Sequence, residues 1–232
     1  MEQKVSAMFG ELTHIDEMEW GNYAFSQDFL RGKVDIENQQ DMISKAIACG
    51  EAYAKQIWDT YKTRNPKVIA EKLKIDIAYK DEPMGDKRVL YAQFIPENKI
   101  EIMLHPQQVY KELLTTLDDK EVKDLPKIEE IEKTIIAHEI FHFLEEQNET
   151  TIYTRVNKIK LWKVWKFEQK STIRAVGEIA AMSFAKTIVG TKYSPFTLDF
   201  LLFYGYNINI AIDKYKFMIQ FKEEGNKQND TK

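Results

Sequence analysis

The short pattern His138-Glu139-Ile140-Phe141-His142 constrains this chain more than any other feature of its sequence. On an α-helix, residues four positions apart lie on one face, so His138 and His142 can present two imidazoles to the same metal ion. Glu139 follows the first histidine, where its carboxylate can accept a proton without being a metal ligand. The chain has only four histidines, and two of them fall in this pattern. The pattern therefore predicts a helix that carries a metal site.

Apolar residues at helical spacing precede the motif. Ile128, Ile131 and Ile135 lie on the same face as the two histidines, which predicts a helix over 127–147 that turns this face toward the core. A metal would then lie between the helix and the protein interior. The alternative is a pair of core histidines with hydrogen-bonded partners, accompanied by a solvated glutamate.

An open tetrahedral zinc site needs a third protein ligand, and one helix cannot surround the metal alone. The other two histidines, His14 and His105, both precede the motif helix. Glu145 and Glu146 lie on the motif helix itself. A carboxylate from a second, downstream helix is therefore the better candidate.

Glu178 is such a carboxylate. It is one of few acids in an otherwise apolar stretch of a helix expected over 160–189, and a buried carboxylate must be paired or bound to a metal. The alternative for Glu178 is an ion pair with Arg174, which lies one helical turn earlier.

These residues resemble the ImmA/IrrE family of zinc metallopeptidases, a gluzincin-like group. The family combines His-Glu-x-x-His with a later helix that contains Glu-x-x-Ala-x-x-Phe-Ala. The chain has this second pattern at Glu178, Ala181, Phe184 and Ala185. Upstream, an alanine-rich helix and Asn-Pro-x-x-Ile-Ala-x-x-Leu-x-Ile at 65–75 follow a similar order. The resemblance covers roughly residues 40–190.

The resemblance implies zinc bound by His138, His142 and Glu178, with Glu139 as the general base. It also implies cleavage of a peptide bond inside the cell, in known members often in a transcriptional repressor. Two features depart from the family pattern. Phe141 stands near the substrate path where a small residue is usual, and the stretch between His142 and Glu178 is longer than in compact members.

Two functional hypotheses of different classes follow. The first is a zinc-dependent metalloendopeptidase, a cytoplasmic hydrolase that cleaves a protein or peptide substrate such as a regulatory protein. The alternative is a non-catalytic zinc-binding protein of the same fold that acts by regulation or interaction. The ligands and the base would be present in both, so the sequence does not separate them.

Together with the resemblance, the hydrophobic pattern predicts an α+β fold with a zincin-like core: a small antiparallel sheet, the motif helix and added C-terminal helices. Strands are expected at 75–79, 89–95 and 99–104. Helices are expected at 39–61, 66–73, 106–117, 127–147, 160–189, 195–204 and 208–222, with a surface loop at 118–124. The pairs Asn65-Pro66 and Ser194-Pro195 are expected to start helices as cap and first-turn residues. The expected division is an acidic N-terminal segment at 1–38, a metallopeptidase domain at 39–222 and a polar tail at 223–232.

Composition narrows the functional classes further. The chain has 232 residues, 33 Lys+Arg and 37 Asp+Glu, for a net charge of −4, which excludes a generally basic, phosphate-coating protein. A single cysteine, Cys49, excludes a disulfide framework and a cysteine-rich zinc site. We see no signal-peptide pattern and no apolar run of membrane-spanning length. We therefore expect a cytoplasmic protein with no membrane partner.

A basic segment at 155–174 contains seven Lys or Arg residues, one acid and three interleaved aromatic residues, Trp162, Trp165 and Phe167. Such a segment could bind nucleic acid or an acidic substrate. The favoured interpretation is an amphipathic helix with its lysines on one face and its aromatic residues in the core. Nucleic acid is therefore not an expected partner.

Tyrosines after the motif are candidates for stabilising the oxyanion of a tetrahedral intermediate. They are Tyr153, Tyr193, Tyr204 and Tyr206. Nothing in the sequence selects one of them.

Overall fold

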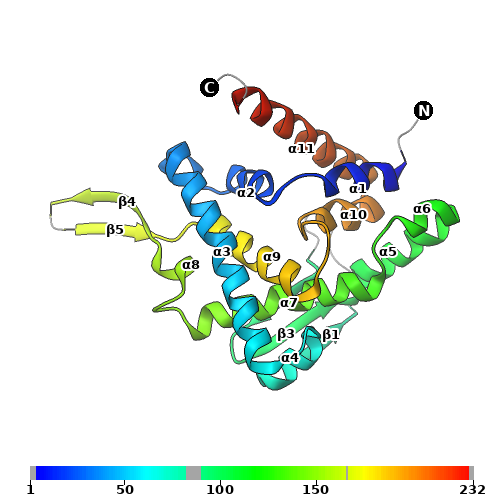
Figure 1. The fold of residues 1–232 in the computed structure, drawn as a ribbon, viewed down its shortest axis with the longest axis horizontal. Helices are drawn as coiled ribbons and strands as arrows, with labels where there is room; N and C mark the ends of the chain where they lie inside the picture. The colour runs from blue at the N-terminus through cyan, green and yellow to red at the C-terminus, as the bar shows by residue number, and fades with distance from the viewer. Residues whose placement is uncertain (1–3, 82–89, 166, 230–232) are drawn as a thin grey trace.

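The computed structural model describes residues 4–81, 90–165 and 167–229. Helices dominate it and two small sheets complete it, so the predicted α+β class is confirmed (Figure 1). The helices are α1 (Val5–Thr13), α2 (Glu17–Ser26), α3 (Ile36–Tyr61), α4 (Pro66–Lys72), α5 (Leu104–Thr116), α6 (Asp119–Lys123), α7 (Ile128–Gln147), α8 (Tyr153–Val156), α9 (Arg174–Val189), α10 (Thr197–Tyr206) and α11 (Ile208–Asn229), with a 3-10 turn at Arg31–Lys33. The strands are β1 (Asp76–Lys80), β2 (Ala92–Ile95), β3 (Lys99–Met103), β4 (Ile159–Val164) and β5 (Phe167–Ser171).

The centre of the molecule is formed by α3, α7 and α9, with α9 packed against both of the others (Figure 1). The close approach of α3 to α9 depends on Gly50. A Cβ atom at this position would lie 2.2 Å from the backbone oxygen of Ala180 and 2.8 Å from the backbone nitrogen of Phe184. Phe184 of α9 also packs against Phe141 of α7, and both rings are fully buried. This packing fixes α9 against the motif helix.

The three-stranded sheet has the order β1-β3-β2, and it corrects the prediction of a purely antiparallel sheet. β2 and β3 form the expected antiparallel hairpin, with Glu97 and Asn98 at positive φ in its turn. β1 instead runs parallel to β3, so the hairpin places β3 in the middle of the sheet. Alternating side chains predict strands but not their order, which is why the sequence missed this arrangement. Part of the second expected strand and the turn before it, at 82–89, lie outside the described residues.

Helix starts were predicted with mixed success. Asn65 caps α4, and Pro66 occupies its first turn, as expected. Ser194 does not cap α10, which starts at Thr197. The Ser194 hydroxyl instead donates to Glu17, and the Ser194 carbonyl accepts from the backbone N–H of Thr197. The segment expected as a loop at 118–124 contains α6, because the Asp118 side chain accepts two backbone N–H groups. The last helix continues through part of the expected polar tail, to Asn229.

The segment at 155–174 is not the expected amphipathic helix. It forms the hairpin of β4 and β5, which projects away from the helical body (Figure 1). Glu168 pairs with Lys160 across the strands and with Lys170 on its own strand. Trp162 is 51% exposed and Trp165 is 92% exposed, so these aromatic residues are not in the core. Lysines three apart fit a helical face, but aromatic and β-branched residues also favour strands, and here the strand preference prevails.

The N-terminal helix contributes to the same core as the motif helix. Val5, Met8, Phe9 and Leu12 of α1 are all buried there. The division into segments at 1–38, 39–222 and 223–232 stays a prediction. Within the described ranges, no helix combines the length and apolar character that a membrane crossing requires.

Candidate metal centre

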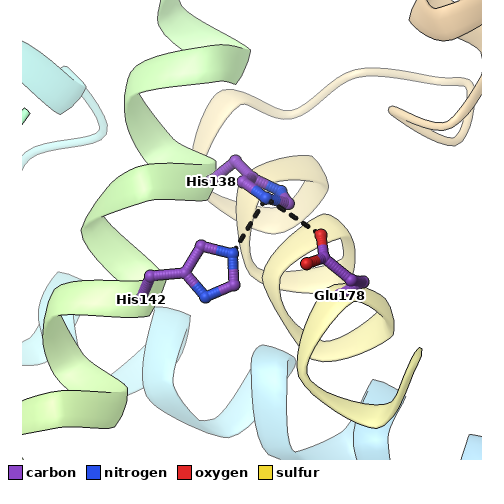
Figure 2. A group of neighbouring side chains, drawn as sticks. All are labelled: His138, His142 and Glu178. Carbon is purple, nitrogen blue, oxygen red and sulfur yellow. Dashed lines mark hydrogen bonds and ion pairs between the residues drawn. The ribbon is translucent and has the colours of Figure 1, made fainter. Parts of the chain in front are cut away.

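The two motif histidines lie on one face of α7, and Glu178 of α9 faces them (Figure 2). The Nε2 atoms of His138 and His142 are 3.0 Å apart. The Glu178 Oε2 atom is 3.4 Å from the Nε2 atom of His138. The structure thus brings together the three residues that the sequence indicated as metal ligands, because the packing of α9 on α7 places the carboxylate opposite the imidazoles.

The spacing of these three donor atoms suits a metal ion. They all lie within 4.8 Å of one another. Two ligand atoms about 2.0–2.1 Å from a tetrahedral zinc ion are separated by roughly 3.3 Å. The observed separations of 3.0 and 3.4 Å are close to this value. Two imidazoles and one carboxylate are also a common ligand set of catalytic zinc sites. The group could therefore hold a metal ion.

The charges of the cluster also favour a cation. Burial lowers the pKa of His138, but the hydrogen bond to Glu178 and the nearby charges of Glu139, Glu178 and Asp199 outweigh it and raise the pKa to about 9. Burial raises the pKa of Glu178, but its interactions with His138 outweigh it and lower the pKa to about 2. Without a metal, a proton on His138 supplies the positive charge that this environment favours. A divalent cation would supply it instead.

The alternative partner of Glu178, Arg174, is present but weak. Its Nε atom lies 3.5 Å from the Oε1 atom of Glu178, whereas His138 approaches the other oxygen. The Arg174 side chain is 75% exposed, and exposed ion pairs contribute little to stability. Arg174 therefore does not account for the position of Glu178 between α7 and α9.

Glu145 has a supporting role that the sequence analysis missed. Its Oε2 atom lies 2.8 Å from Nδ1 of His142 and 3.3 Å from the guanidinium of Arg155, and the residue is buried. A carboxylate on the second ring nitrogen fixes the orientation of a metal-binding histidine. The spacing of three residues between His142 and Glu145 on one helix was the available signal. The Nδ1 atom of His138 is buried, and no described residue forms a hydrogen bond with it.

Glu139 points to a different neighbour. Its Oε2 atom accepts a hydrogen bond of 2.6 Å from the backbone N–H of Phe94 in β2. Glu139 is 7% exposed and lies outside the group of three candidate ligands. β2 is at the edge of its sheet. Glu139 therefore lies between the candidate ligands and a strand edge, and its role as a general base stays a prediction.

The three candidate ligands and Glu139 line one cleft with a volume of about 1230 Å³. Its walls come from α2, β2, α7, α8, α9 and α10, with Lys214 contributed by α11. None of the four tyrosines suggested as oxyanion donors is among the described residues that line it. Tyr193 instead donates to Glu130, and the Tyr206 hydroxyl lies 2.6 Å from Nδ1 of His105.

The tyrosines that do line the cleft are Tyr23 and Tyr91. The sequence analysis missed them because it considered only tyrosines after the motif. The packing of α2 and of the segment before β2 brings these earlier residues to the site.

Comparison of the chain with protein-family models, with curated proteins and with solved structures found no match.

Proposed function

We propose that the protein is a zinc metallopeptidase with a zincin-like core. The observation that carries this proposal is the convergence of His138, His142 and Glu178 in an open cleft that Glu139 also lines. The resemblance to the ImmA/IrrE family, which rests on the same residues, supports zinc as the metal. It also supports hydrolysis of a peptide bond in an intracellular protein as the reaction.

In this proposal His138, His142 and Glu178 hold the zinc ion, and Glu145 keeps the ring of His142 in position. When bound, zinc supplies a Lewis acid that polarises the scissile carbonyl and lowers the pKa of water. Glu139 accepts the proton of the attacking water and returns it to the leaving amine. The low exposure of Glu139 keeps competing bulk water away from its carboxylate.

A peptide suits the shape of the cleft. The volume of about 1230 Å³ exceeds the range of about 300–1,000 Å³ that is usual for small-molecule pockets. Residues 90–94, which include the start of the edge strand β2, line the cleft. An extended peptide can add to such an edge through backbone hydrogen bonds. A cleft that is open to this strand also argues against the alternative of a purely structural metal site.

The decisive experiment replaces Glu139 by glutamine. Glu139→Gln keeps the size of the side chain and removes the base, so it should retain zinc and fold but lose hydrolysis by a factor on the order of a hundred or more. The measurement is cleavage of a library of internally quenched peptides by wild type and variant at equal zinc occupancy.

The matched control is Glu129→Gln, an exposed glutamate on the same helix that is not among the described residues lining the cleft. It should leave hydrolysis unchanged. A Glu139→Gln variant as active as the wild type would refute the peptidase mechanism and leave the metal site standing. A wild type that binds zinc but cleaves no peptide, with a biological activity that Glu139→Gln preserves, would favour the non-catalytic alternative.

A further inference from the structure

A second carboxylate, Asp199 of α10, lines the cleft but does not belong to the group of candidate metal ligands. Among the described residues its side chain has no hydrogen-bond partner and no ion-pair partner within 4.0 Å. Burial raises the pKa of Asp199, while the positive charges of Lys214 and His138 lower it. Asp199 is therefore a partly desolvated acid close to the candidate metal ligands, without a direct partner among the described residues.

Lys214, whose charge acts on Asp199, leaves its carboxylate available. Lys214 of α11 lines the same cleft, but its Nζ atom lies 4.7 Å from the ring centroid of Phe203, on which it packs. Lys214 thus offsets part of the negative charge without forming a contact ion pair with Asp199.

A tyrosine hydroxyl beside this acid also lacks a partner. The hydroxyl oxygen of Tyr91 is buried, and no described residue forms a hydrogen bond with it. Burial and the charge of Asp199 raise the pKa of Tyr91 well above its usual value, so the hydroxyl is a neutral donor. A buried polar group without a partner is rare and costly in a folded protein. Its position in the wall of the cleft indicates that a ligand supplies the missing partner.

The surroundings of Asp199 fit a long side chain with a charged end. The same helix contributes Leu198 and Leu202 to the wall of the cleft, and Phe196, which precedes the helix, also lines it. Apolar walls pack against the methylene stem of lysine or arginine, whose charged end then reaches a polar group. An N-terminal amine has no such stem, so the apolar walls favour a basic side chain.

Among the described residues, the lining of the cleft is acidic. The bases that line it there are Arg155, Arg174 and Lys214. The acids that line it are Asp28, Glu139, Glu145, Glu146, Glu149, Glu178 and Asp199. Negative charge therefore still exceeds positive charge after a divalent metal ion is added. Such a cleft attracts cationic substrates and disfavours acidic ones.

We propose that Asp199 and Tyr91 form a specificity subsite for a lysine or arginine side chain of the peptide substrate. This inference rests on the proposed peptidase function and names its substrate class. The Asp199 carboxylate accepts the charged donors of the side chain. The Tyr91 hydroxyl donates to a carbonyl of the same peptide.

The test uses binding rather than hydrolysis, so that it does not depend on turnover. Three tripeptide hydroxamates carry lysine at the first, second or third position, and each is matched by a norleucine analogue. Hydroxamates anchor on zinc, and calorimetry with the zinc-loaded full chain measures each affinity. We expect a preference for lysine at one position on the order of tenfold to a hundredfold, the range of a hydrogen bond to a charged group.

Three variants test which residue causes the preference for lysine. Asp199→Asn should abolish it, whereas Glu129→Gln, which removes the same charge from an exposed position of α7 outside the described lining of the cleft, should preserve it. Tyr91→Phe should weaken the lysine and norleucine ligands equally, by a few fold. It should not destabilise the protein, because it removes a hydroxyl to which no described residue forms a hydrogen bond.

The outcomes separate this inference from the proposed function. If no hydroxamate binds the zinc-loaded protein, both proposals are refuted. If all bind without a preference for lysine, the metal site stands and the subsite is refuted. A preference that survives in a folded Asp199→Asn variant also refutes the subsite.

Discussion

The sequence suggested a role for both the helix pair α7–α9 and the hairpin β4–β5, but only in the helix pair does the structure bring the suggested residues together. In the helix pair each key side chain is held by several neighbours, as His142 is held between His138 and Glu145. In the hairpin Trp165 is 92% exposed and has few neighbours to fix it. The neighbours of a buried residue limit it to few possible roles, whereas an exposed residue has no such limit. The predictions below test this contrast, from the largest expected effect to the smallest.

The largest effect should come from loss of a motif histidine. We expect the wild type to hold about one zinc per chain and His138→Ala or His142→Ala to hold almost none, because two ligands do not retain zinc in an open site. Elemental analysis after dialysis measures the metal content.

The control for the histidine variants is His105→Ala. The His105 ring contacts the hydroxyl of Tyr206 rather than the cluster, so this variant should keep its zinc. A wild type that carries no metal and gains none when zinc is added would remove the basis of the whole proposal.

Substitution of two carboxylates at the proposed metal site should weaken zinc affinity to different degrees. Glu145→Gln leaves all three proposed ligands in place and should weaken zinc affinity by about 10–100-fold, the usual effect of losing a partner of a ligand. Glu178→Gln removes a ligand and should weaken affinity by more than that. Competition with a chromophoric chelator measures both. Equal losses would mean that the wrong carboxylate has been assigned as a ligand.

The next prediction concerns the packing of α3 against α9. Gly50→Ala would place a methyl group against the backbone of α9, which cannot move aside like a flexible side chain. It should lower the free energy of unfolding by about 2–3 kcal/mol and also weaken zinc affinity, because α9 carries Glu178. Denaturation in urea, with and without zinc, measures the change.

Gly10→Ala is the matched control for Gly50→Ala. A Cβ atom at Gly10 in α1 meets no other atom within 4 Å. The substitution should therefore stabilise its helix by about 0.5–1 kcal/mol. If both variants changed stability in the same direction, the close contact between α3 and α9 would not be a constraint on the fold.

Much of the fold followed from the sequence where one periodicity dominates. The helices that became α3, α7 and α10 were predicted within a few residues, and Asn65-Pro66 marked the start of α4. Strand order did not follow, because alternation at 75–79 gives no information on the neighbouring strand. The hairpin did not follow either, because the same lysines and aromatic residues fit two periodicities.

The candidate site divides in the same way. His138, His142 and Glu178 were found because the chemistry of a metal needs those residue types at those spacings. Tyr91 and Asp199 were missed as parts of the cleft, since their place depends on how β2 and α10 pack around α7. No local pattern marks a residue whose role depends on packing between distant segments.

The smallest effect on stability should come from the tip of the hairpin. Trp165 is 92% exposed and has a φ of 58°, a left-handed conformation that glycine adopts more easily. Trp165→Gly therefore loses little burial and relieves local strain. It should change the free energy of unfolding by no more than about 1 kcal/mol, in the stabilising direction, with unchanged zinc content.

A tryptophan in the core provides the comparison for Trp165. Trp20 is 2% exposed and stacks on Phe196, with ring centroids 5.7 Å apart. Trp20→Ala should cost about 3–5 kcal/mol. If Trp165→Gly destabilised the protein by a similar amount, the hairpin would be part of the folded core, and the contrast between the two regions would fail. A loss of the proposed peptide cleavage with stability unchanged would instead mean that the hairpin contacts the substrate.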